Sequence, residues 1–303
     1  MSSRRILVTG ATGFIGGLLT RRLIADGYHV RCLVRDSEAA NATALAAVGC
    51  ELAVADITRP AGLAEALAEV EVAYFLVHMI GGGEDYPAIE RAAAVRFARA
   101  AKAAGVSRVI YLGGLGDDPS SKHLAARHEA AAALAHEGPP LTYFRAAMVV
   151  GRGSESFELL RAIVERLPLL PAPDWLDNQT QPIGAEEVVG YLRQALDIEE
   201  SIGREIQIGG PQVLTHQQVV DEMAAALGRR APLRIPMSAE IARPATVAAG
   251  AAAVTQGRPA VAAELSLGLT KPTVVSDPSG AELFDVRPRR LDAVLAAAID
   301  EGR

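Results

Sequence analysis

Residues 5–17 read RILVTGATGFIGG and decide the fold of the chain. A short apolar strand runs into three glycines with the spacing G-x-x-G-x-x-G, and a helix with one apolar stripe follows at once. Gly10 can adopt the backbone angles of a sharp turn, Gly13 lets a pyrophosphate approach the main chain, and Gly16 lets the helix pack on the strand. The first N–H groups of the helix and its positive dipole end then face the phosphates. Because strand, turn and helix occur together, we predict a dinucleotide site with these contact residues: Gly10, Thr12, Gly13, Phe14 and Ile15.

The composition of the 303 residues suits a helix-covered sheet and argues against several classes of protein. Half of the residues are hydrophobic and only 4% are aromatic, so the core is built from Ala, Val, Leu and Ile. The formal charge of −6 argues against non-specific binding to nucleic acid or to acidic membranes. Gln256, Arg258 and Glu264 interrupt the alanine-rich stretch 246–269, so we expect no membrane insertion. No Cys/His cluster has the spacing of a zinc site, so we expect no metal.

The two cysteines bear on the cellular compartment. Cys32 and Cys50 lie in apparent strands, where free cysteines behave as small hydrophobic residues. The chain also begins without the charged and apolar regions of a signal peptide. We therefore expect a cytoplasmic protein with reduced thiols.

Apolar runs of strand length alternate with helix-period segments through the first half of the chain. This alternation indicates βαβ units, and hence a doubly wound α/β fold of the Rossmann type with a parallel sheet of six or seven strands. We assign residues 1–151 to a dinucleotide-binding domain. Residues 152–303 are assigned to a C-terminal region that completes the sheet and covers the substrate cleft. The expected strands are 5–9, 28–34, 50–55, 71–77, 107–112 and 141–145, with a further short strand at 205–208.

Residues that follow the second and third strands bear on the choice of cofactor. Arg35 stands where an arginine would bind the 2′-phosphate of NADP, and Asp36 could take the ribose hydroxyls of NAD. Because Arg35 offers a forked donor for phosphate, NADP is favoured and NAD stays open. After the third strand, Asp56 could accept a hydrogen bond from the adenine amino group while Ile57 packs on the ring. Asp56 could also cap a local helix.

These features resemble the short-chain dehydrogenase/reductase superfamily, in its extended and atypical branches. The NmrA-like group of NAD(P)-binding proteins is the most similar, on the stretches 109–116 (VIYLGGLG), 144–151 (FRAAMVVG) and 181–183 (QPI). That group includes relatives of the nucleotide-binding accessory subunit of respiratory complex I. The resemblance implies a Rossmann domain that binds NAD(P) across the strand ends, with these residues lining the cofactor: Leu76, Val77, Leu112, Gly113, Gly114, Ala146, Ala147 and Met148.

The positions that carry catalysis in active members of this superfamily differ here. Those members have Ser or Thr after the fifth strand and a Y-x-x-x-K pair on the next helix. This chain has Gly113 and Gly114, and then His123 and Arg127 at the spacing of that pair, which places both side chains on one helix face. His123 is a candidate general acid or base, and Arg127 is a candidate contact for ribose or phosphate whose charge also lowers the pKa of the imidazole. Both residues could equally lie on a solvated helix surface.

Three other side chains give weaker signals. His78 ends an apolar run and is expected to be a packed histidine rather than a base. Tyr143 lies in a predicted strand and is expected in the core. Trp175, between prolines, either lines the substrate pocket or anchors its loop.

Two functions stay open on the sequence. The first is an NADP-dependent oxidoreductase that acts on a small organic substrate without the usual Tyr/Lys pair. The second is a non-catalytic NADP(H)-binding redox sensor or assembly or regulatory protein, which the loss of the catalytic side chains favours. An isomerase or dehydratase that recycles its cofactor would usually need the missing tyrosine. The predicted helices 88–104 and 122–136 either form a homodimer interface or are solvated in a monomer.

Overall fold

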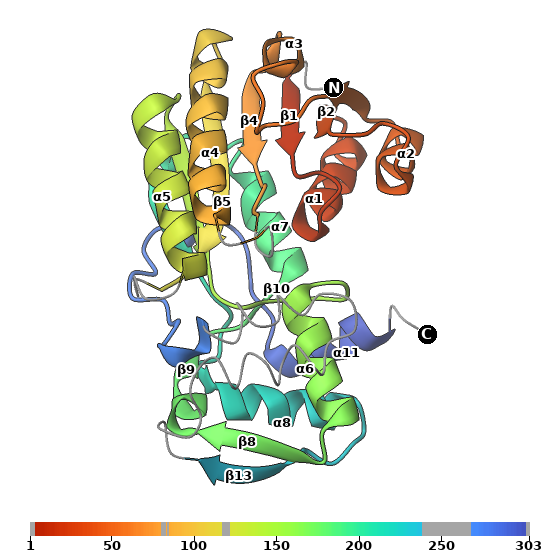
Figure 1. Cartoon of the computed structure of the whole chain (residues 1–303), viewed down its shortest axis with the longest axis vertical. Helices are drawn as coiled ribbons and strands as arrows, with labels where there is room; N and C mark the ends of the chain where they lie inside the picture. Colours follow the sequence, from red (N-terminus) through yellow and green to blue (C-terminus); the bar gives the residue numbers. More distant parts are fainter. Residues whose placement is uncertain (1–3, 80–82, 84, 117–121, 238–267, 301–303) are drawn as a thin grey trace.

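A seven-stranded parallel sheet forms the centre of the computed structural model, which describes residues 4–79, 83, 85–116, 122–237 and 268–300. In the strand order β11-β6-β5-β4-β1-β2-β3, β1 lies between β4 and β2, and the crossovers run outward on both sides (Figure 1). This order confirms the predicted doubly wound α/β fold, and the seventh strand is the short one expected near residue 205. The strands are β1 (Arg5–Thr9), β2 (His29–Val34), β3 (Glu51–Val54), β4 (Val72–Phe75), β5 (Arg108–Gly114), β6 (Leu141–Ala146) and β11 (Glu205–Ile208).

Helices cover both faces of the sheet, so that successive strand residues enter two different cores. Ile6 and Val8 of β1 pack into a cluster with α1, α2 and α7, whereas Leu7 packs on the other side with α3, α4 and α5. A strand buried on both faces needs a continuous apolar run, which explains why β1 does not alternate with polar residues. The helices are α1 (Phe14–Ala25), α2 (Ala40–Ala47), α3 (Leu63–Leu67), α4 (Tyr86–Ala103), α5 (Lys122–Glu137) and α7 (Ala185–Gln194).

A third apolar cluster lies beyond the carboxyl ends of the strands, in the lower part of Figure 1. It gathers side chains from α6 (Glu155–Arg166), α8 (His216–Ala226) and α11 (Leu291–Asp300), next to the parallel pair β8 (Leu169–Pro173) and β13 (Leu233–Met237). The chain reaches this cluster after β6 and returns to the main sheet through α7 and β11 before entering it again. Two further short pairs complete the C-terminal half: β7 (Val149–Val150) with β10 (Ile183–Gly184), and β9 (Gln179–Thr180) with β12 (Leu214–Thr215).

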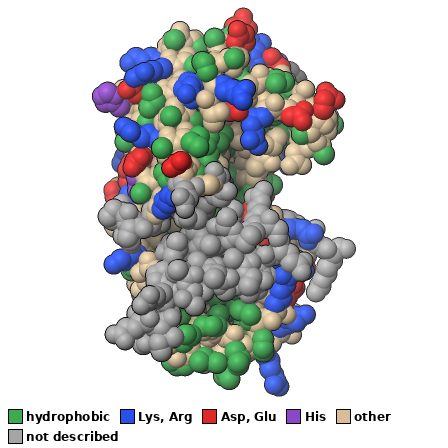
Figure 2. All heavy atoms as spheres, viewed as in Figure 1, with side chains coloured by type: hydrophobic (Ala, Val, Ile, Leu, Met, Phe, Trp, Pro, Cys, Tyr) green, Lys and Arg blue, Asp and Glu red, His purple; other side chains and the backbone are tan. Residues whose placement is uncertain are grey.

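The surface of this lower part carries exposed apolar side chains on the β8–β13 pair. Leu169, Leu233 and Ile235 are each more than 40% exposed, and hydrophobic atoms gather at the bottom of Figure 2. Most of the alanine-rich stretch 246–269 lies outside the described residues. Within the part of the chain that the structure describes, no helix has the length and apolar character needed to cross a membrane.

Candidate functional site

A cavity of about 850 Å³ begins at the carboxyl ends of β1, β4, β5 and β6 and reaches into the C-terminal cluster. We call its first part the glycine lobe, since the turn after β1 and the ends of the other strands line it. The second part is the apolar lobe, which side chains of the C-terminal half line. The glycine lobe comprises residues 10–18, Leu76, Leu112, Gly113, Gly114, Ala146, Ala147 and Met148. The apolar lobe comprises Leu159, Leu160, Ile163, Leu170, Leu176, His216, Val219 and Val220.

The turn after β1 has the geometry that its glycines predict. Gly10 has a φ of +68°, a conformation that a side chain strains, and a Cβ there would lie 2.7 Å from the carbonyl oxygen of Leu76. A Cβ on Gly16 would overlap the carbonyl oxygen of Gly10, so only glycine lets α1 start this close to β1. Gly13 is the N-cap of α1 and supplies no side chain to the first N–H groups of that helix. Those N–H groups and the bare main chain therefore suit a pyrophosphate.

Most of the residues predicted to line the cofactor meet in this lobe. Thr12, Phe14 and Ile15 line it with the glycines, and so do all the predicted residues after β5 and β6. Val77 does not line the cavity, because its carbonyl faces Arg127, 3.3 Å from a guanidinium nitrogen. Ile57 is 5% exposed and packs in the core beside α3 and α4. The contact of Ile57 with the adenine ring and that of Val77 with the cofactor stay predictions.

Arg35 and Asp56 lie outside the lining of the cavity, at the ends of neighbouring strands. Burial alone would raise the pKa of Asp56, but hydrogen bonds from the Thr58 N–H and hydroxyl, each 2.8 Å long, and the charges of Arg35 and Arg59 lower it. One carboxylate oxygen of Asp56 thus closes a local turn at Thr58 and caps no helix, because α3 begins only after Gly62; the expected helix cap is wrong. Arg35 is exposed and close to this carboxylate, which leaves its guanidinium accessible to a ligand phosphate.

Two residues near this end of the cavity were missed by sequence reasoning. Arg21 lies about two turns into α1, where its guanidinium donates to the carbonyl of Gly17 at 3.3 Å, and Asn41 is the second residue of α2. Both line the cavity. The i, i+4 spacing of Arg21 from Gly17 is the signal that could have found the arginine.

The position that holds Ser or Thr in active members of the superfamily is closed by neighbouring side chains. A Cβ on Gly113 would lie 2.7 Å from the ring of Tyr143, and one on Gly114 would lie 2.7 Å from a methyl of Leu124. Tyr143 is 5% exposed, and its hydroxyl lies 3.2 Å from Nδ1 of His128. The prediction that Tyr143 belongs to the core is confirmed. A side chain at position 113 would therefore meet the Tyr143 ring, whereas at position 114 only the end of the Leu124 side chain would have to move.

His123 lines the cavity from the first turn of α5 and is neutral there. Burial, aided by the charges of Arg127 and His78, lowers the pKa of His123 to about 3. The predicted effect of Arg127 on the imidazole is thus confirmed in direction. A neutral imidazole can donate one hydrogen bond and accept another, but it is a poor general acid at neutral pH.

Arg127 is a buried residue that holds the ends of two strands together. Its guanidinium donates to the carbonyls of Leu112 and Val77, lies 3.5 Å from a carboxylate oxygen of Glu90 and stacks 4.9 Å from the ring centre of Tyr111. The other oxygen of Glu90 accepts from the N–H of Met79 at 2.9 Å. The pair therefore fixes β4, β5 and α4 against α5. Arg127 also lines the cavity, and its contact with ribose or phosphate stays a prediction.

Two further histidines face the cavity, and both differ from what the sequence indicates. His78 is exposed and lines the cavity, so the expectation of a packed histidine is wrong; the segment leaves the sheet at Phe75, and His78 lies beyond the strand. Nothing in the sequence pattern indicates a role for His216. It is 4% exposed at the start of α8, lines the apolar lobe, and has a pKa lowered to about 4 by burial. No short-range pattern marks it, because a histidine after a Thr cap is common at a helix start.

Trp175 is the last of the residues that the sequence singles out. Trp175 packs at the edge of the C-terminal cluster, and its neighbour Leu176 lines the apolar lobe.

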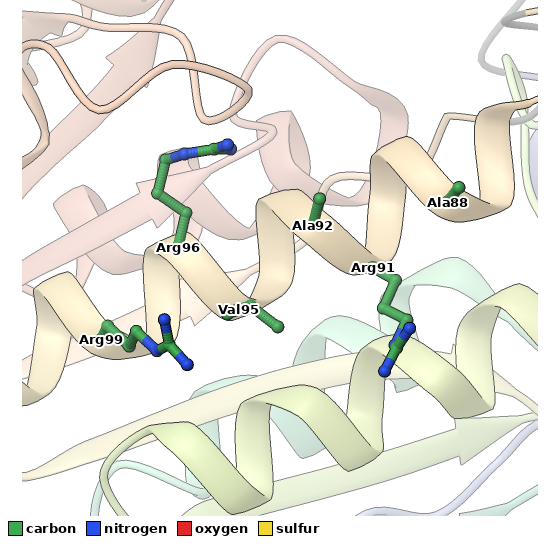
Figure 3. Close-up of a pocket in the computed structure, with 6 residues that line it drawn as sticks. All are labelled: Ala88, Arg91, Ala92, Val95, Arg96 and Arg99. Atoms are coloured by element: carbon green, nitrogen blue, oxygen red, sulfur yellow. The ribbon is translucent and has the colours of Figure 1, made fainter.

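A second, open hollow lies on α4 alone, where Arg96 extends on one side and Arg91 and Arg99 on the other (Figure 3). Arg99 bonds Glu137 at the end of α5, at 2.9 Å. This hollow shares no lining residue with the cavity at the glycine turn. Across the described residues, no group of three His, Cys, Asp or Glu side chains could hold a metal ion.

Comparisons with known proteins give one family and a set of similar folds. Residues 2–240 match the NmrA-like family. The triphenylmethane reductase of a Citrobacter species, complexed with NADP(H), has a TM-score of 0.75 at 20% identity over 97% of this chain and 99% of that one. The NADPH-dependent quinone oxidoreductase of Escherichia coli, complexed with NADPH, has a TM-score of 0.76 at 20% identity over 97% and 99%. A nucleoside-diphosphate-sugar epimerase from Pseudomonas aeruginosa has a TM-score of 0.74 at 24% identity over 99% and 97%.

One curated protein is similar over a short stretch. The photosystem II assembly factor Ycf39 of Cyanophora paradoxa is 40% identical over 67 residues, which are 22% of this chain. The match spans a fifth of the length of that relative. The solved structures, all below 25% identity, share the fold with this chain.

Proposed function

Because the chain belongs to the NmrA-like family, we propose that it is an NADP(H)-dependent oxidoreductase that reduces a small, uncharged organic compound. One observation carries the proposal: a single cavity joins a glycine turn that suits a pyrophosphate to a lobe of apolar side chains. The NADP(H) complex of the triphenylmethane reductase and the NADPH complex of the quinone oxidoreductase support the choice of cofactor.

Different residues around the glycine lobe are proposed to bind different parts of the cofactor. In this proposal the N–H groups after Gly13 bind the pyrophosphate, and Arg35 binds the 2′-phosphate with a charged fork. The ends of β5 and β6 line the nicotinamide half. When bound, reduced nicotinamide supplies a hydride to the substrate. The C-terminal half, residues 152–303, covers the substrate at that point.

The protein offers little acid to that reaction, and this limits the substrate. His123 is neutral, the serine position is closed, and Arg127 cannot release a proton. His123 can still donate a hydrogen bond to a substrate oxygen that gains negative charge. A carbonyl compound whose reduced form is a stabilised anion, such as a quinone, needs the least protonation during hydride transfer, and water can protonate it afterwards. Quinones are therefore the substrate class that we favour.

Binding titrations with NADPH and NADH, followed by turnover on a panel of quinones and aldehydes, test the proposal. We expect NADPH to bind about tenfold more tightly than NADH, a difference of about 1.4 kcal/mol, and Arg35→Ala to remove the difference. Arg59→Ala is the matched control, since Arg59 also lies near Asp56 but follows the third strand. His123→Ala should lower kcat several-fold and leave NADPH affinity unchanged. Equal affinity for NADH, unaffected by Arg35→Ala, would overturn the choice of NADP.

A second candidate function is a non-catalytic NADP(H)-binding sensor or assembly protein. The closed position at Gly113 favours it, because a tyrosine-driven reaction has no room for its serine partner. The short similarity to a photosystem II assembly factor is compatible with it. A sensor should bind NADPH and NADP⁺ with clearly different affinities and turn over no compound of the panel. Turnover of any quinone at a rate that depends on His123 would exclude this candidate.

A further inference from the structure

His216 is a buried polar side chain that lines the cavity and has no hydrogen-bond partner for its ring in the described part of the chain. The residue is 4% exposed, and neither ring nitrogen has a hydrogen-bond partner among the described residues. Its main-chain N–H is satisfied by the carbonyl of Asn178 at 3.2 Å, so the helix start does not depend on the imidazole. Thr215, the residue before it, supplies the side-chain cap of α8. The ring itself therefore contributes nothing to the local structure.

Such a side chain is expensive to keep in a protein interior. A buried donor or acceptor without a partner costs about 1–3 kcal/mol, and most buried polar groups are hydrogen-bonded for this reason. Other polar side chains at the same cavity are satisfied: the hydroxyls of Thr180 and Thr273 lie 2.9 Å apart, and that of Ser154 accepts from the N–H of Phe157 at 3.1 Å. The His216 ring has no such partner among the described residues, and a bound ligand is a source of one.

The surroundings of His216 define the chemistry of that partner. Val219 and Val220 follow it on α8, and Leu170 and Leu176 line the same cavity from β8 and the turn after it. Burial lowers the pKa of His216 to about 4, so the ring is neutral at pH 7 and offers a bound anion no countercharge of its own. A neutral imidazole in apolar surroundings can donate to a carbonyl oxygen, whereas an anionic group would lose its hydration without gaining a countercharge.

We propose that His216 is a specificity-determining residue that donates a hydrogen bond to a carbonyl oxygen of an uncharged substrate bound in the apolar lobe. The inference rests on the proposed oxidoreductase function and names the substrate-binding residue of that same cavity. The bond orients the substrate ring toward the glycine lobe. It also selects uncharged carbonyl compounds, quinones among them, over their anionic derivatives.

Trp175 provides a direct binding assay that needs no turnover. It is the single tryptophan of the chain and packs beside the apolar lobe, next to Leu176. Quinones quench indole fluorescence at short range, so titration of the NADP⁺-bound protein with 1,4-naphthoquinone reports occupation of the lobe. We expect saturable quenching by 1,4-naphthoquinone and at least tenfold weaker binding of 1,4-naphthoquinone-2-sulfonate.

Two substitutions at position 216 separate a binding role from a structural one. His216→Leu should weaken 1,4-naphthoquinone binding by about three- to tenfold, in line with the loss of one hydrogen bond. The same variant should keep or raise Tm, because it removes a polar group without a partner. His216→Gln retains a donor and should restore most of the affinity. Met223→Ala, buried on the same helix but outside the cavity lining, should lower Tm and leave the affinity unchanged.

A nitrogen-15 NMR measurement on the wild-type protein covers the case in which a variant fails to fold. The imidazole resonances of His216 should shift when 1,4-naphthoquinone quenches Trp175. Unshifted resonances at saturating quinone, or a His216→Leu variant with wild-type affinity, would overturn the inference. Failure of the proposed function has a different signature: the protein would bind no NADPH, or would bind it and oxidise it with no quinone, whatever the residue at position 216.

Discussion

The two lobes of the cavity are built in opposite ways. Main-chain atoms and glycines form the glycine lobe, and nine of its lining positions are the consecutive residues 10–18. Side chains from α6, β8, the turn after β8 and α8 form the apolar lobe, and tertiary packing brings α8 from a later part of the chain to the other three segments. The first lobe is therefore fixed by local turn geometry, whereas the second depends on the packing of the whole C-terminal half.

The lobes also differ in how their polar groups are satisfied. In the glycine lobe, Arg127 and Glu90 bond each other and the carbonyl and N–H groups that end β4 and β5. In the apolar lobe, His216 has no partner among the described residues. Arg127 bonds main-chain carbonyls near the ends of β4 and β5, whereas the described residues give the His216 ring no hydrogen bond, and a buried polar group without a partner is costly unless a ligand supplies one. This contrast assigns rigidity to the first lobe and selectivity to the second, and three predictions test it.

Removal of the Arg127 charge should have the largest effect. In Arg127→Met, Glu90 is left buried without its cation, and breaking a buried pair in this way costs about 3–5 kcal/mol. Chemical denaturation should therefore show a large fall in the free energy of unfolding, together with weaker NADPH binding. Arg99→Met removes a solvated partner of Glu137 and should change neither. A stable Arg127→Met protein that loses only NADPH affinity would instead support the predicted contact of Arg127 with the cofactor.

The second-largest effect is expected from an alanine substitution in the glycine turn. It should weaken NADPH binding at only one of two adjacent glycines. In Gly16→Ala the new methyl group overlaps the carbonyl of Gly10, so α1 must move away from β1 and from the phosphates. We expect NADPH binding to weaken about 100-fold, which is close to 3 kcal/mol. Gly17→Ala is the control, since its methyl group would lie 3.4 Å from the nearest atoms. Equal affinities for the two variants in a fluorescence titration would show that the turn is not held by this contact.

The same contrast explains how much of the site could be predicted from the sequence. The spacing of Gly10, Gly13 and Gly16 within seven residues predicts the phosphate-binding turn. The alternation of strands and helices predicts the parallel sheet. The loss of a hydroxyl at Gly113 is visible in the sequence, but its cause is not. The ring of Tyr143, thirty residues away in the chain, fills that space because β5 and β6 are neighbours.

Residues whose roles depend on burial were the hardest to predict. Arg127 stands at the expected spacing, but its carboxylate partner lies on another helix, at Glu90. His216 is distinguished only by the absence of partners and by its place at the cavity, which no local pattern encodes. His78 was expected to be packed because the apolar run before it reads as strand, yet β4 ends three residues earlier. Spacing along the chain thus predicts main-chain geometry well and side-chain environment poorly.

The smallest predicted effect is on the pH dependence of the free energy of unfolding. It tests the apolar lobe alone, through His216. The pKa of His216 is about 4 in the folded protein and near 6.5 when the chain is unfolded, so below pH 6.5 the unfolded state takes up a proton that the folded state refuses. The stability that comes from keeping the His216 ring neutral in the folded protein is fully present above pH 6.5. It is lost as the pH falls toward 4. Between pH 7 and pH 5 the wild type should lose about 2 kcal/mol more than His216→Leu. His136→Gln, at an 85% exposed side chain, is the control. Parallel curves for wild type and His216→Leu in urea denaturation would mean that water reaches the ring, and that the lobe is less apolar than its lining indicates.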